Sequence, residues 1–142
     1  MPSSKVSFHF QTTSFNLSDR KKLKSFIRQL FSKENGKFES LHYIFCTDEF
    51  LLEINQQYLQ HDFYTDIITF NLSESTSVVG EIYISIDRVK DNASQFSSSF
   101  KSEIHRVIFH GALHLCGYDD KTSSKKKIMS QREDYYLERY FK

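Results

Sequence analysis

The chain has 142 residues, of which 39% are hydrophobic and 26% charged, and this balance predicts one globular domain spanning residues 1–142. The formal net charge of +1 predicts that a polyanionic partner would be attracted by a local patch of charge. Because no apolar run is long enough to cross a membrane, and the first residues lack the pattern of a secretory signal, we expect a cytoplasmic protein with no membrane partner.

The first half of the chain is predicted to alternate between strands and helices. Hydrophobic periodicity and β-branched or aromatic residues place these elements at residues 6–10, 19–33, 41–47 and 48–59. Ser18 and Asp48 are residue types that cap helix N-termini, so we expect each to cap the helix that follows it.

The second half is predicted to begin with two strands, at residues 66–71 and 79–86, as antiparallel neighbours across a Ser-rich loop. Three helices are expected to follow, at residues 87–94, 100–116 and 123–140, with Gly117 ending the second and Thr122 capping the third. This order predicts an α+β fold, an α/β sandwich, with a small mixed sheet of about four strands and about five helices.

Two histidines four residues apart give the strongest functional signal. His110 and His114 lie in the segment H-G-A-L-H-L-C-G-Y-D-D, and their spacing puts them on one face of a helix, about 5–6 Å apart. The apolar residues around them predict a buried central helix. Gly117 then turns the chain, so that Asp119 or Asp120 can approach the helix end. Two imidazoles, a carboxylate and an open position commonly hold catalytic zinc, and we therefore predict one Zn²⁺ per chain on this helix.

Other interpretations of these residues remain open from the sequence. Each histidine could be a core residue bonded to a carbonyl, and the same donor set also serves non-haem iron. A zinc peptidase would carry glutamate at the position of Gly111, which disfavours that class. We expect Gly111 to permit close approach of a backbone or a substrate, and His105 to lie at the surface.

Residues 110–120 resemble the H-G-x-L-H-L-x-G-Y-D-H signature of the YbeY family. Residues 54–70 are similar to that family's L-N-x-x-Y-R-x-K-D-x-P-T-D-V-L-S-F, residues 80–85 to its G-D-I-x-I-S, and residues 127–136 to its last helix. The resemblance implies a single-strand-specific, metal-dependent endoribonuclease. Such an enzyme acts in maturation of the 3′ end of 16S ribosomal RNA and in ribosome quality control.

The resemblance also implies roles for individual residues. Aligned on Gly117, Asp120 takes the place of the family's third histidine, so His110, His114 and Asp120 are the implied metal ligands. Because position 111 carries no glutamate, Asp119 is one candidate for the catalytic residue, for proton transfer or for orienting a ligand. The attacking group, a water or the 2′-OH of the RNA, is not decided by the sequence.

Two further departures from the family pattern lie in residues 54–70, where the family's Pro is Tyr64 and its Arg is Leu59. The change at Leu59 removes a charge that would contact phosphate, so another base, such as Arg88, Arg106 or a lysine, would have to take its place. A cluster of lysines next to the predicted metal site is either a solvated helix face or an RNA-binding surface. Its members are Lys121, Lys125, Lys126 and Lys127.

Two functions of other classes remain as alternatives. One is a non-catalytic ribosome-assembly factor in which zinc stabilises the fold and the surface binds RNA or ribosomal proteins. The other is a zinc hydrolase of a different ester or amide. Under the favoured interpretation the partner is single-stranded RNA, with small-subunit ribosomal RNA as the expected substrate.

Overall fold

A computed structural model describes residues 4–12 and 15–142. Its four strands are β1 (Lys5–Phe10), β2 (Phe38–Cys46), β3 (Ile67–Asn71) and β4 (Val78–Ser85). They form one mixed sheet in the order β1-β2-β4-β3, in which β1, β2 and β4 are parallel and β3 is antiparallel to β4. The predicted mixed sheet and its antiparallel pair are therefore confirmed.

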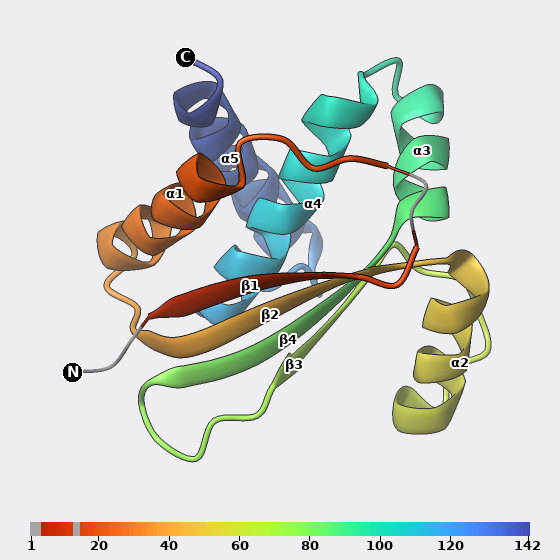
Figure 1. Ribbon diagram of the computed structural model, residues 1–142, viewed down its shortest axis with the longest axis horizontal. Helices are drawn as coiled ribbons and strands as arrows, with labels where there is room; N and C mark the ends of the chain where they lie inside the picture. Colours follow the sequence, from red (N-terminus) through yellow and green to blue (C-terminus); the bar gives the residue numbers. More distant parts are fainter. Residues whose placement is uncertain (1–3, 13–14) are drawn as a thin grey trace.

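Helices cover both faces of this sheet unequally. The five helices are α1 (Arg20–Lys33), α2 (Asp48–Leu59), α3 (Ile86–Gln95), α4 (Phe100–Leu115) and α5 (Ser123–Tyr140). Figure 1 shows α1, α4 and α5 over one face and α2 on the other side. The predicted α+β class is confirmed. Among the described residues no helix has both the length and the apolar character needed to cross a membrane.

The core lies between the sheet and the helices over it. In β2, alternate residues point toward the helices because strand side chains alternate between faces: Leu41, Tyr43 and Phe45 are fully buried. The Tyr43 hydroxyl donates a 3.0 Å hydrogen bond to the carbonyl oxygen of Ile108 in α4. This bond satisfies a buried phenol and fixes the central helix against the middle of the sheet.

Two of the predicted helix caps are wrong by one residue. Thr47, and not Asp48, caps α2 through its hydroxyl, because Asp48 is itself the first residue of the helix. At α1 the cap position is taken by Asp19, in a left-handed conformation and without a side-chain cap bond, so Ser18 lies one residue too early. Thr122 caps α5 as predicted.

Helix α4 ends as the sequence predicts. Gly117 has φ +110°, a region that favours glycine because it has no Cβ. The amide of Tyr118 donates to the carbonyl oxygen of Leu113, and that of Gly117 to the carbonyl oxygen of His114, both at 3.1 Å. This C-terminal capping pattern turns the chain so that residues 118–122 run back along the helix end.

Two expectations about α4 are corrected by the packing. A Cβ at Gly111 would lie 2.9 Å from Ile82 Cγ2 and 3.1 Å from Ile67 Cδ1, so the close approach is to side chains of the sheet and not to a backbone or substrate. His105, expected at the surface, is 2% exposed and stacks on Tyr140 with 5.0 Å between ring centroids. The C-terminal end of α5 covers this side of α4.

Candidate active site

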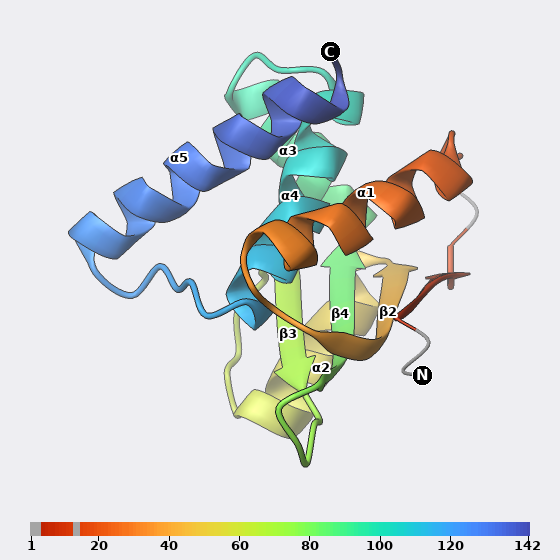
Figure 2. The same ribbon diagram turned by 90° about the vertical axis from the view of Figure 1, so that its left-hand side faces the viewer.

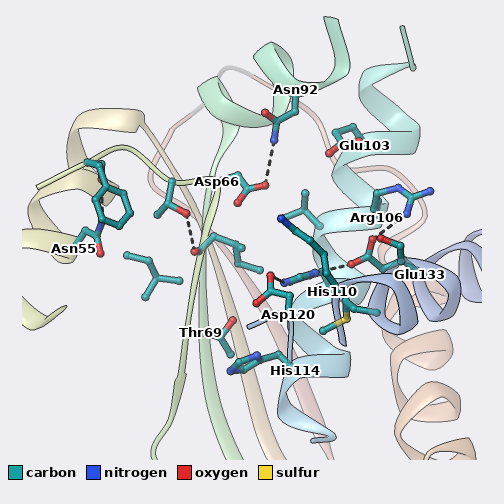
Figure 3. Close-up of a pocket in the computed structure, with 18 of the residues that line it drawn as sticks. Asn55, Asp66, Thr69, Asn92, Glu103, Arg106, His110, His114, Asp120 and Glu133 are labelled. Atoms are coloured by element: carbon teal, nitrogen blue, oxygen red, sulfur yellow. Dashed lines mark hydrogen bonds and ion pairs between the residues drawn. The ribbon is translucent and has the colours of Figure 1, made fainter. Parts of the chain in front are cut away.

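A cleft of about 690 Å³ runs along the exposed side of α4. Its walls are β3, the α2–β3 loop of residues 60–66, the C-terminal end of α3, and α5. Figure 3 shows polar side chains from these elements converging on it. The cleft brings together residues from 55 to 133 along the chain.

One strip of α4 faces the cleft. Arg106, His110 and His114 are spaced by four residues and all line it, because side chains at this spacing share one helix face. The expectation that this part of α4 is buried on all sides is therefore corrected. His110 is partly exposed and His114 is exposed, since solvent reaches the helix through the cleft.

His110 is held by a carboxylate from α5. Its Nδ1 lies 2.6 Å from Oε2 of Glu133, which is 6% exposed. Because an ionised carboxylate only accepts, Nδ1–H donates this bond and leaves Nε2 facing the cleft. Arg106 donates to the other oxygen of Glu133 at 2.9 Å. Burial alone would lower the pKa of His110. The hydrogen bond to Glu133 and the negative charges of Glu133, Asp120 and Asp66 outweigh this effect, so the pKa is raised from its ordinary value.

Asp120 lies on the cleft side of His110. Its Oδ2 is 3.8 Å from His110 Nε2, and both residues line the cleft with His114 (Figure 3). Two ligands about 2.0–2.2 Å from a tetrahedral ion lie roughly 3.3–3.6 Å apart, so this pair is close to the spacing a metal needs. In the described part of the chain, no three His, Cys, Asp or Glu side chains are gathered tightly enough to hold an ion as they lie.

The pKa of His114 is lowered from its ordinary value, first by burial and then by the neighbouring charge of His110. A lowered pKa keeps an imidazole neutral near pH 7, and the neutral ring is the form that binds metals.

Asp119 makes contacts with its own loop and with α5. Its carboxylate accepts from the backbone amide of Lys121 at 3.0 Å and from Lys125 Nζ at 3.3 Å. The amide of Lys121, followed by the side chain and charge of Lys125, lowers the pKa of Asp119. Asp119 is not among the described residues that line the cleft. These contacts fit a residue that fixes the turn carrying Asp120.

The four lysines of the predicted RNA-binding cluster are all exposed. Lys126 lines the cleft, and Lys125 pairs with Asp119. Among the described residues, Lys121 and Lys127 do not line the cleft. The structure thus brings one member of the cluster to the cleft and leaves the other three outside it.

Two carboxyl groups outside the predicted ligand set also line the cleft, one part-buried (Asp66) and one buried (Glu103). Asp66 Oδ2 accepts a 3.1 Å hydrogen bond from Asn92 Nδ2, and Glu103 is 7% exposed. Burial raises the pKa of both groups. For Asp66, the positive charge of His110 opposes that rise. No local spacing marks these residues, because they meet only when α3 and α4 pack beside β3.

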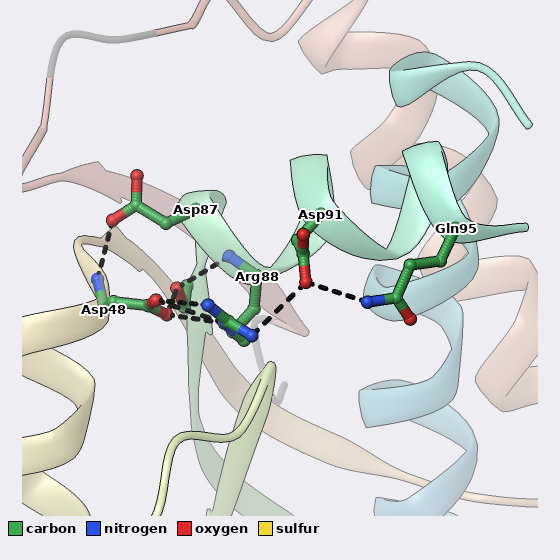
Figure 4. A network of polar contacts seen from close by, with 6 residues as sticks. Asp48, Asp87, Arg88, Asp91 and Gln95 are labelled. Carbon is green, nitrogen blue, oxygen red and sulfur yellow. Dashed lines mark hydrogen bonds and ion pairs between the residues drawn. The ribbon is translucent and has the colours of Figure 1, made fainter.

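The two arginines considered for phosphate binding are both engaged by carboxylates. Arg88 donates from Nε to both oxygens of Asp48, at 3.2 and 3.1 Å, and from Nη1 to Asp91 at 3.3 Å. Figure 4 shows this network, in which Asp48 also accepts from Ser85. Arg88 is not among the described cleft residues, whereas Arg106 is.

Comparison with known proteins agrees with this arrangement. The sequence model of one family, described as endoribonuclease YbeY, matches residues 7–141. A curated endoribonuclease YbeY of Cytophaga hutchinsonii is 46% identical over 133 residues, which are 93% of each chain. One from Bacteroides thetaiotaomicron is 42% identical over 130 residues, 90% of this chain and 95% of the relative.

A solved structure has the same fold. The solution structure of a Thermotoga maritima protein superimposes with a TM-score of 0.63 at 29% sequence identity. The match covers 96% of this chain and 89% of that one. The likeness therefore extends over the sheet and the helices.

Proposed function

The chain belongs to the endoribonuclease YbeY family, and we propose that it cuts single-stranded RNA in the cleft beside α4 with the help of one zinc ion. Membership makes it an endoribonuclease, a hydrolase of RNA phosphodiester bonds, and implies a role in ribosomal RNA maturation. The finer proposal is cleavage near the 3′ end of 16S ribosomal RNA, in ribosome maturation and quality control, in the cytoplasm.

The observation that carries this proposal is the donor arrangement around His110. One ring nitrogen is tied to Glu133 at 2.6 Å, and the other faces Asp120 Oδ2 at 3.8 Å. A ligating histidine almost always donates its second N–H to a carboxylate or carbonyl group. His110 has this environment, so the chemistry of the donor set fits a metal.

We assign the metal to His110, His114 and Asp120. Three protein ligands and one open position are the usual arrangement of catalytic zinc. When bound, zinc would polarise the phosphodiester and stabilise the charge that develops in the transition state. Glu133 would fix the ring of His110, and Asp119 would hold the turn that presents Asp120. Lys126 would attract the phosphate backbone toward the cleft.

Metal content tests the ligand assignment. Protein purified without chelator should contain about one zinc per chain by elemental analysis. The variants Asp120→Ala and His114→Ala should lose it, whereas Asp119→Ala should keep most of the metal with activity lowered about 10–100-fold. His42→Ala, which changes a histidine outside the cleft, is the control. Wild-type protein that neither contains nor takes up zinc would contradict the proposal.

Cleavage tests the reaction. Zinc-loaded protein should cut a single-stranded oligoribonucleotide and leave the matching duplex intact, and His114→Ala should cut neither. Protein that holds zinc and binds RNA without cutting it would instead support the non-catalytic assembly factor. Cleavage that persists in His114→Ala would place the reaction elsewhere.

A further inference from the structure

An exposed aromatic pair lies at the rim of the cleft. Phe63 and His61 stack with 5.0 Å between ring centroids and 21° between ring planes. Both line the cleft, and both belong to the α2–β3 loop. Phe63 is 56% exposed, so one face of its ring is open to a ligand in the cleft.

A buried side chain fixes the position of this pair. Asn55, in α2, is 1% exposed, and its Nδ2 donates to the carbonyl oxygen of Phe63 at 2.8 Å. The backbone carbonyl oxygen of Asn55 accepts from the amide of His61 at 3.1 Å, and the side chain of Gln56 donates to that of Asp62 at 2.6 Å. The backbone is thus held on both sides of the rings, so they are placed before any ligand arrives.

Neighbouring exposed aromatic residues have partners within the fold. The guanidinium of Arg88 lies 5.5 Å over the ring of Tyr64, and Tyr58 packs edge-on against Phe70 at 6.0 Å. Among the described residues, the ring of Phe63 stacks on no aromatic ring other than that of His61. Core packing therefore does not account for the exposed ring of Phe63.

We propose that Phe63 and His61 form a stacking subsite for one unpaired nucleobase of the substrate. This inference rests on the proposed function, RNA cleavage in the cleft. Every nucleobase has a flat π face, so stacking on aromatic rings tolerates any sequence. A base inside a duplex is already stacked on both sides and has no free face. The subsite would hold the nucleotide beside the phosphate that enters between Lys126 and the histidines of α4.

Single abasic substitutions locate the stacked base. A short single-stranded oligoribonucleotide is synthesised with one abasic position, which is moved stepwise through the cleaved region. For zinc-loaded wild-type protein, one position should raise KM about 5- to 150-fold, the usual worth of one stacked base, with a much smaller change in kcat.

Variants of Phe63 test whether the rise in KM comes from the loss of stacking on its ring. Phe63→Ala should raise KM for the intact RNA by the same factor, and the sensitive abasic position should then add little, because ring and base act as one pair. Phe63→Trp should restore tight binding, whereas Phe63→Leu, apolar but without a π face, should not. Each variant should melt at the wild-type temperature, since the side chain is half exposed.

Control variants separate this proposal from the proposed function. Tyr58→Ala removes a similarly exposed ring outside the cleft and should leave KM unchanged. Wild-type protein that cuts RNA, together with a Phe63→Ala variant of unchanged KM, would overturn the subsite alone. A loss of binding in Phe96→Ala but not in Phe63→Ala would move the subsite to the end of α3. Failure of the wild-type protein to bind or cut RNA would overturn the proposed function.

Discussion

The hydrogen bond between His110 and Glu133 is the contact on which the site most depends. We predict that Glu133→Gln weakens zinc binding by about 10–100-fold, the usual effect of changing a group that orients a metal ligand. The glutamine oxygen can still accept from the imidazole, but the negative charge that raises the pKa of His110 is lost. Competition titration with a zinc-binding dye measures the affinity.

The matched control is Glu138→Gln, an equally conservative change at an exposed position of the same helix. It should leave zinc affinity at the wild-type value. Equal affinities for wild-type protein and Glu133→Gln would show that the carboxylate has no part in metal binding.

A pH dependence of stability follows from the buried position of His105. Burial lowers its pKa, so the folded protein keeps it neutral while the unfolded chain becomes protonated below about pH 6.5. The unfolded state then binds more protons, and stability is lost as the pH falls through this range. Replacing His105 with Phe should narrow the difference in Tm between about pH 7.5 and about pH 5.5 by a few degrees.

His42→Phe, at a part-exposed position on β2, serves as the comparison for His105→Phe. It should leave the wild-type pH dependence in place. If His105→Phe shows the same change of Tm with pH as the wild-type protein and His42→Phe, protonation of His105 does not contribute to acid destabilisation.

At the residue scale, the sequence predicted what local geometry decides. The spacing of His110 and His114 alone puts both rings on one face of a helix, and both line the cleft. Glu133 is 23 positions from His110, and its role depends on how α5 docks, which no local pattern specifies. The burial of His105 was missed for the same reason, because it is covered by Tyr140 from α5.

The elements fit together through the close approach of α4 to the sheet. We predict that Gly111→Ala destabilises the protein by about 1 kcal/mol. Overpacking costs about 1–3 kcal/mol because the new methyl would meet Ile82 Cγ2 at 2.9 Å, while the gain in helix propensity returns about 1 kcal/mol. Urea denaturation of wild-type protein and variant measures the difference.

Making Gly111→Ala in a second protein background separates the cost of overpacking from the gain in helix propensity. In Ile82→Ala, where the nearer opposing side chain is shortened, Gly111→Ala should destabilise less, because the contact with Ile67 Cδ1 at 3.1 Å remains but the 2.9 Å contact is removed. The same loss in both backgrounds would show that the contact with Ile82 is not the cause.

Element types and most boundaries were predictable because periodicity and caps are local. The predicted strand at 66–71 and the observed β3 (Ile67–Asn71) differ by one residue. The order β1-β2-β4-β3 was not predicted, since the parallel pairing of Tyr43 with Ile82 joins residues from distant parts of the chain. That pairing places β3 at the edge of the sheet, where its free side forms a wall of the cleft.

For the molecule as a whole, the small net charge makes the position of the lysines important. We predict that replacing Lys125, Lys126 and Lys127 together with Ala weakens RNA binding and lowers the slope of log affinity against log salt by up to about 2. Each contact with single-stranded nucleic acid contributes about 0.7 to that slope through counterion release. Fluorescence anisotropy at several salt concentrations gives the slope.

The control removes the same charge elsewhere. Lys5, Lys21 and Lys90 are exposed and do not line the cleft, so their joint replacement by Ala should leave the slope nearly unchanged. If both triple variants lower it equally, the net charge and not the cluster attracts RNA.

Helix α5 has two parts that differ in how they are held. Residues 123–128 are all exposed, and Met129 is the first buried residue of the helix; Figure 2 shows this end extending away from the sheet. The Thr122 cap and the Lys125–Asp119 ion pair hold this end, but it buries no side chain against the rest of the fold, so its opening free energy is below that of the core. We predict that the lysine-bearing turns open more readily than the segment around Glu133, which is buried one turn beyond Met129. If RNA binds as proposed above, one helix would combine an adjustable RNA-binding end with a rigid support for His110.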